Sequence, residues 1–197
     1  MSQIYVSYRR QDSPIWQIRL YDYLLSHFGN TILRDIESIP IGISFNELIK
    51  ERVSLCDVML VIIGPNWLEV NDRLGERRIT SDNDFVRLEI AYALSVKKRV
   101  IPVLLGETVL PKIADLPADL SELVLKQPIR VNEQSWDADV NRLIGIINET
   151  FDSSGLQLSN NRTKGVFVSY SHKDEEWKDR LVTQLSVLEV ENLLHVW

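Results

Sequence analysis

The chain has 197 residues, of which 45% are hydrophobic and 25% are charged, and its formal net charge is −6. This composition is that of an ordinary globular protein, and the negative charge excludes the basic surface that non-specific binding to nucleic acid or to an anionic membrane requires. The single cysteine, Cys56, excludes a disulfide framework and favours a reducing, cytoplasmic compartment, and the longest apolar run is too short to span a membrane.

Apolar periodicity predicts five strands that alternate with helices over residues 1–151. The run at residues 58–63 is uniformly apolar, as is typical of a central parallel strand covered on both faces. Because crossovers between parallel strands are right-handed, the pattern predicts a flavodoxin-like α/β fold, an open parallel sheet in the order 2-1-3-4-5 with helices on both faces. The strands are expected at residues 4–8, 31–34, 58–63, 100–105 and 129–131.

Capping residues predict where the helices begin and end. Asp12, Ser13 and Pro14 supply the start of the first helix, and Gly29 with Asn30 ends it. Asp84 is the predicted cap of the third helix. The second helix is expected to carry apolar residues from Phe45 to Val53 on one side, and the last to run from Trp136 to Ile147.

The part of the chain after residue 151 repeats the beginning. Residues 152–163 are rich in Ser, Asn and Gly and are expected to form an exposed linker. Residues 166–170 then parallel residues 4–8, and Trp177 falls at the helical position that Trp16 occupies in the first copy. Residues 164–197 are therefore expected to hold the first strand, the first helix and the start of the second strand of an incomplete second domain.

Ligands of open parallel sheets bind beyond the carboxyl ends of the strands, where the strand order reverses. Here that point lies between the first and third strands. The helix that begins after Asp84 places Phe85 and Glu89 one turn apart on one face. A carboxylate beside an aromatic ring, with Arg9 and Arg10 nearby, suits an anionic ligand that develops positive charge during reaction, and NAD is such a ligand.

Five segments carry a family resemblance: residues 6–10, residue 35 with 39–42, residues 56–58, residues 63–67 and residues 84–90. Together they resemble a TIR (Toll/interleukin-1 receptor) domain of the bacterial, NAD-consuming type over the whole first domain. Residues 166–172 resemble the start of another TIR domain. The second copy carries Ser171 and His172 in place of Arg9 and Arg10, and no residue of it corresponds to the third helix.

The resemblance implies that Glu89 is the catalytic residue and that NAD is the substrate, with no cofactor. Members of the family often carry tryptophan where this chain has Phe85. The three histidines share no ligand spacing with one another or with Cys56, so no metal site is expected. The substrate-binding residues implied are Tyr8, Arg9, Arg10, Asp35, Gly42, Phe45, Trp67 and Phe85.

The function expected from the resemblance is that of an NAD glycohydrolase or cyclase, a signalling enzyme in bacterial defence that becomes active when TIR domains self-associate. Association is expected through the BB loop, residues 35–45, and the product is either linear or cyclic ADP-ribose. The alternative is a non-catalytic TIR–TIR scaffold or adaptor, and a third option is a nucleoside N-glycosidase or transferase.

Simpler roles remain open for the individual residues. Glu89 is also compatible with a plain helix-surface carboxylate. Arg9 and Arg10 are also compatible with solvated ion pairs to Asp12, Asp35 or Glu37. Trp67 and Phe85 are also compatible with core packing.

Overall fold

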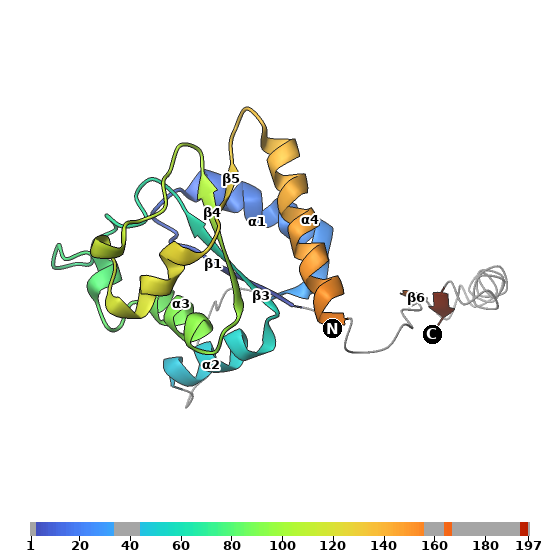
Figure 1. The fold of residues 1–197 in the computed structure, drawn as a ribbon, viewed down its shortest axis with the longest axis horizontal. Helices are drawn as coiled ribbons and strands as arrows, with labels where there is room; N and C mark the ends of the chain where they lie inside the picture. The colour runs from blue at the N-terminus through green and yellow to red at the C-terminus, as the bar shows by residue number, and fades with distance from the viewer. Residues whose placement is uncertain (1–2, 34–43, 156–163, 167–193, 197) are drawn as a thin grey trace, which may run out of the picture. The chain divides into compact units, whose positions relative to one another are not determined.

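The computed structural model describes residues 3–33, 44–155, 164–166 and 194–196. The chain divides into two compact units, Met1–Ser154 and Gly155–Trp197. The first unit is drawn from blue to orange in Figure 1. Its strands and main helices are β1 (Ile4–Ser7), α1 (Pro14–Phe28), β2 (Ile32–Leu33), α2 (Phe45–Leu55), β3 (Val58–Ile63), α3 (Phe85–Ser95), β4 (Arg99–Leu105), β5 (Ile129–Val131) and α4 (Trp136–Gly155).

The five strands form one parallel sheet in the order β2-β1-β3-β4-β5, which confirms the predicted fold class. Ile4 of β1 is in register with Ile32 of β2 on one side and with Val58 of β3 on the other. The chain therefore moves outward from β1 in both directions. The reversal of strand order falls between β1 and β3, as the sequence predicts.

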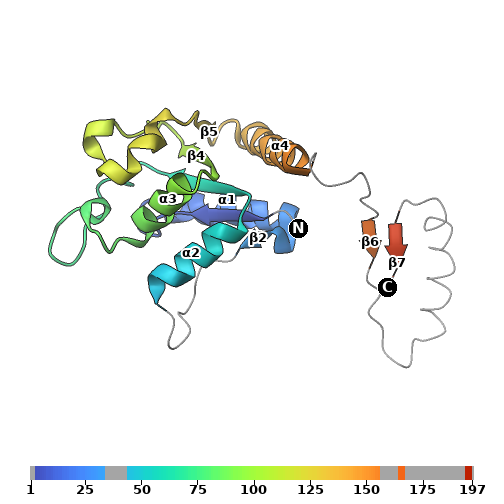
Figure 2. The ribbon, with the colours of Figure 1, turned by 60° about the horizontal axis from the view of Figure 1, so that its bottom comes forward.

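Each face of the sheet has its own apolar core. Ile4 and Val6 of β1 belong to the core under α1 and α4, whereas Tyr5 belongs to the core under α2 and α3. This follows from strand geometry, because successive side chains of a strand point to opposite faces. Figure 1 shows α1 and α4 on one side of the strands, and α2 and α3 lie side by side on the other in Figures 1 and 2.

Short 3-10 helices fill the connections around the sheet. Leu120 and Leu123, from the 3-10 segment η4 (Ala118–Leu125), are buried in the core beneath α3. The remaining 3-10 segments are η1 (Gly29–Thr31), η2 (Arg78–Thr80) and η3 (Ile113–Asp115).

Two of the predicted helix ends are confirmed. The side chain of Asp84 caps α3 by accepting a hydrogen bond from the backbone N–H of Arg87 at 2.9 Å. Gly29 ends α1 with a φ of 52°, in the region that favours glycine.

The predicted start of α1 at Asp12, Ser13 and Pro14 is confirmed, but the side chain of Asp12 does not cap the helix. The helix begins at Pro14, and Ser13 occupies the cap position without a side-chain hydrogen bond. Instead, the Asp12 carboxylate accepts hydrogen bonds from the backbone N–H groups of Gly64 at 2.6 Å and Asn66 at 2.7 Å. The side chain of Asp12 thus ties the loop after β1 to the loop after β3.

Burial raises the pKa of Asp12, and the backbone hydrogen bonds from Asn66 and Gly64 partly offset that rise. The carboxylate leaves no space beside Gly64. A Cβ atom added there would lie 2.7 Å from Oδ2 of Asp12 and 2.8 Å from Oδ1. Glycine is therefore required at position 64 because a fixed side chain occupies the volume.

Helix α4 continues to Gly155, four residues into the predicted linker at 152–163. Phe151 explains part of this extension, because it is buried and packs edge-on against Phe28 of α1, with ring centroids 6.3 Å apart. The helix ends at a glycine, a common residue at helix C-termini.

In the second unit, β6 (Lys164–Val166) pairs in parallel with β7 (Leu194–Val196). The assignment of residues 164–197 to an incomplete second TIR domain remains a prediction. Among the described residues, no helix combines the length and the apolar character needed to cross a bilayer.

We expect Gly64→Ala to lower the free energy of unfolding by about 1–3 kcal/mol, because the added methyl overlaps the buried Asp12 carboxylate. The measurement is urea denaturation followed by circular dichroism. Gly145→Ala is the matched control: no atom lies within 4 Å of a Cβ there, and alanine should stabilise α4 by up to about 1 kcal/mol. Equal effects at the two positions would contradict the role given to Asp12.

Candidate functional site

Glu89 lies on the face of α3 that packs against the sheet. It shares this face with the buried residues Val86, Ile90 and Ala93, and only 8% of its surface is exposed. A carboxylate in such a position is costly unless hydrogen bonds compensate for the lost water. Glu89 is therefore not a solvated residue on the helix surface.

Two hydroxyl groups of β1 supply such hydrogen bonds. The Tyr5 hydroxyl donates to Oε1 of Glu89 at 2.7 Å, and the Ser7 hydroxyl donates to Oε2 at 2.6 Å. Both contacts are buried and connect residues more than eighty positions apart in the sequence. Each carboxylate oxygen of Glu89 thus accepts a short hydrogen bond from the strand.

Arg9 forms a second buried contact between the end of β1 and the start of α3. Its guanidinium donates two hydrogen bonds to the Asp84 carboxylate, at 2.9 Å and 2.7 Å, and lies 5.3 Å from the ring centroid of Trp67. The side chains of Arg9 and Asp84 are 2% and 1% exposed. Arg9 therefore pairs with Asp84, a partner that the sequence did not predict, and this ion pair is buried, not solvated. Asp35 and Glu37 lie outside the described residues.

The other predicted substrate-binding residues occupy different surroundings. Tyr8 packs against the core under α1 and α4, on the face of the sheet opposite Glu89. Arg10 is exposed, and Trp67 is fully buried. Phe85, one turn before Glu89 on α3, is 45% exposed, so it is not a core residue. Their roles in binding stay predictions.

Three predicted contacts cannot be placed beside Glu89. Asp35 and Gly42 lie outside the described residues. Phe45 is the first residue of α2, and its side chain is also outside what the structure describes.

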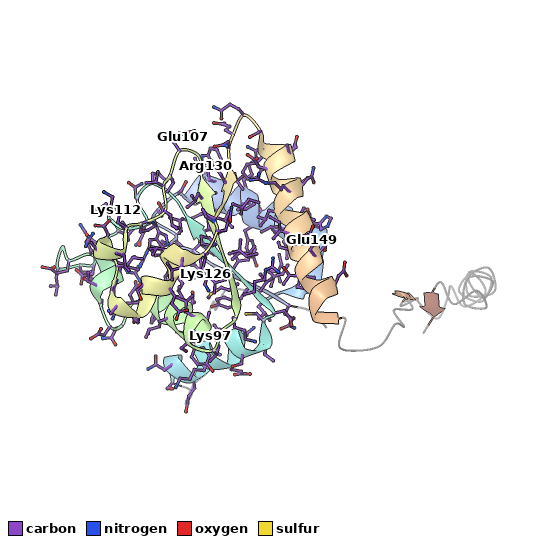
Figure 3. All side chains as sticks on the ribbon, viewed as in Figure 1. Lys97, Glu107, Lys112, Lys126, Arg130 and Glu149 are labelled. Carbon is purple, nitrogen blue, oxygen red and sulfur yellow. The ribbon has the colours of Figure 1, made fainter. Side chains whose placement is uncertain are left out.

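The first unit contains a cavity of about 600 Å³ at the carboxyl ends of β3 and β4. Trp16 and Trp67 contribute to its mainly apolar lining, and Glu89 is not among its lining residues. Glu107 and Lys112, labelled in Figure 3, come from the loop after β4. With Glu69 and Asp115 also in the lining, acidic side chains outnumber basic ones, which disfavours a ligand as negatively charged as a diphosphate.

Within the described ranges, no three His, Cys, Asp or Glu side chains are arranged to hold a metal ion. Cys56 is buried, and desolvation raises the pKa of its thiol to about 11. The thiol is therefore neutral near pH 7, so Cys56 fills space in the core and is poorly suited to act as a nucleophile.

The sequence analysis did not predict Tyr5 and Ser7 as partners of Glu89. The available signal is the alternation in residues 4–7, where two hydroxyl side chains fall on one face of an otherwise apolar strand. That pattern predicts a polar partner on the covering helix, and Glu89 is the buried carboxylate of α3.

Comparisons with known proteins confirm that the first domain is a TIR domain. The family model described as "TIR domain" matches residues 4–144. No curated protein matches the chain significantly.

The solved structures similar to the chain include the following two. One is a metazoan TIR-STING receptor from C. gigas in complex with 2',3'-cGAMP, at 16% identity and a TM-score of 0.43, covering 70% of this chain and 38% of that one. The other is the TIR domains of the activated Roq1 resistosome, at 10% identity and a TM-score of 0.41, covering 94% and 99%. The chain thus spans less than half the length of the first structure.

We expect Asp84→Asn to destabilise the protein by about 3–5 kcal/mol, because it leaves the buried Arg9 cation without a counter-charge while keeping a residue that can cap α3. Urea denaturation measures the loss. The matched control is Glu122→Gln, which breaks the exposed pair with Lys97 and should cost less than about 1 kcal/mol. A loss for Asp84→Asn no larger than for the control would show that the Arg9 pair does not hold α3 in place.

Proposed function

This chain belongs to the TIR domain family, and from that premise we propose that it is an enzyme that cleaves the bond between nicotinamide and ribose in NAD. Glu89 is the catalytic residue in this proposal. The family includes signalling domains of both the NAD-cleaving and the scaffold kind, so membership alone does not choose between them.

The observation that carries the proposal is the state of Glu89. The carboxylate is buried, lies where β1 meets α3 and is hydrogen-bonded through both oxygens. A negative charge held in a poorly solvated place interacts with a developing positive charge far more strongly than it would in water. An apolar side chain would pack at this position without the cost of desolvation, so the presence of a carboxylate supports a functional role.

The chemistry requires one such charge. The bond between C1 of the ribose and the pyridinium nitrogen breaks, both electrons go to nitrogen, and nicotinamide leaves as a neutral molecule. The leaving group therefore needs no proton, and the Glu89 carboxylate stabilises the oxocarbenium character at C1. Water that attacks C1 and loses a proton gives ADP-ribose, whereas attack by a group of the same molecule gives a cyclic product.

Self-association is the proposed switch. The BB loop, from Asp35 to Phe45, lies largely outside the described residues, and its role in joining TIR domains rests on the family resemblance. A place in bacterial defence and a cytoplasmic location belong to the same proposal. NAD binds away from the cavity after β3 and β4, because the acidic lining there opposes its diphosphate.

Release of free nicotinamide tests the proposal. Purified protein at high concentration is incubated with NAD, and we expect wild type to release nicotinamide and Glu89→Gln to release at least about a hundredfold less. Glu133→Gln, an exposed glutamate in the loop before α4, is the matched control and should keep full activity.

Circular dichroism must show that the Glu89→Gln protein is folded. No release by concentrated or assembled wild type would refute the enzyme and leave the scaffold role. Equal release by Glu89→Gln and wild type would show that another group carries the reaction. Cleavage of other nucleosides in preference to NAD would favour an N-glycosidase of different specificity.

A further inference from the structure

Tyr5 and Ser7 lie on the face of β1 that α3 covers. Strand side chains two positions apart point to the same face, and these two are separated by Val6, which belongs to the opposite core. The surroundings of Tyr5 are otherwise apolar, since its core contains Val61, Ile90 and similar residues. Two hydroxyl groups on this face are therefore an exception to an apolar pattern.

The hydroxyl groups converge on one carboxylate. Tyr5 has the longer side chain and reaches Oε1, while Ser7 reaches Oε2 with a short one. Because the two donors bind different oxygens, they fix both the position of the carboxyl group and the plane in which it lies. Two donors on different oxygens restrict rotation of the carboxyl group about its terminal bond more than one donor does.

We propose that Tyr5 and Ser7 are positioning residues that hold the Glu89 carboxylate in one orientation and in its charged form for cleavage of NAD, an inference that rests on the function proposed above. Neither residue touches the substrate in this role. The hydroxyl groups donate to the charged carboxylate and so offset the cost of its burial. They also remove the need to reorganise the carboxylate when positive charge develops on the ribose.

The arrangement assigns different tasks to residues of β1 and to Arg9, which follows the strand. Arg9, two positions after Ser7, pairs with Asp84 and fixes the start of α3. Tyr5 and Ser7 fix the residue one turn further along the same helix. Strand β1 and the residues directly after it thereby hold both the start of α3 and the side chain of Glu89 in place.

The test compares Tyr5→Phe and Ser7→Ala with wild type and with Tyr92→Phe. The control removes a hydroxyl group from α3 that contacts only the surface residue Ser54 in the described interactions. For Tyr5→Phe and Ser7→Ala we expect kcat for nicotinamide release to fall by about tenfold each, with KM changed by less than about twofold. Tyr92→Phe should match wild type in both constants.

A second measurement is independent of activity. In protein labelled with ¹³C at the glutamate carboxyl carbons, the Glu89 signal is assigned by its loss in Glu89→Gln. We expect the ¹³C chemical shift of the Glu89 carboxyl carbon to change in Tyr5→Phe and in Ser7→Ala. It should be the same as in wild type in Tyr92→Phe. This signature reports the hydrogen bonds directly, which a general loss of stability would not reproduce in a folded protein.

The outcomes separate the two proposals. If wild type releases no nicotinamide, the proposed function fails, and with it the positioning role of Tyr5 and Ser7 in NAD cleavage, even where the carboxyl signal shifts. If wild type is active while both variants keep its kcat, or while KM alone changes, the positioning role is wrong and the enzyme stands. An unshifted Glu89 signal in both variants would overturn the hydrogen bonds themselves.

Discussion

The contact between α3 and the end of β1 depends on a carboxylate that has been taken out of water. Glu89 is 8% exposed, and Tyr5 and Ser7 donate one hydrogen bond to each of its oxygens. A buried charge without such partners would cost several kcal/mol, so the orientation of α3 and the polar side chains of β1 are mutually dependent. The TIR sheet places this charge at the edge where ligands of parallel sheets bind.

Other buried charges join the strand ends around Glu89 and have structural tasks. Arg9 is neutralised by Asp84, and Asp12 binds the backbone after β3. The cavity after β3 and β4 is separate again, since its lining includes Trp67 but not Glu89. Of the carboxylates buried at this end of the sheet, Asp84 pairs with the Arg9 cation and Asp12 accepts from backbone N–H groups, whereas Glu89 accepts hydrogen bonds from the hydroxyl groups of Tyr5 and Ser7.

The elements of the fold were predictable because they depend on local pattern: the uniformly apolar β3, the cap at Asp84 and the stop at Gly29 all follow from short stretches of sequence. The sheet order followed from alternation and handedness. The partners of Arg9 and Asp12 were not predictable, because each is more than fifty residues away. Glu89 was found by resemblance, while its hydroxyl donors became visible only when β1 and α3 were placed together.

The most direct test is whether the ribose of NAD contacts Glu89. Protein labelled with ¹³C at the glutamate carboxyl carbons is titrated with an NAD analogue in which a methylene group replaces the oxygen of the nicotinamide ribose ring. The analogue binds as NAD does but cannot form the oxocarbenium ion. The predicted result is a saturable shift of the Glu89 carboxyl signal, with the signals of Glu69 and Glu107 at the separate cavity unchanged. Saturation that moves Glu69 and Glu107 but leaves Glu89 in place, or no response at any glutamate, would contradict a catalytic Glu89.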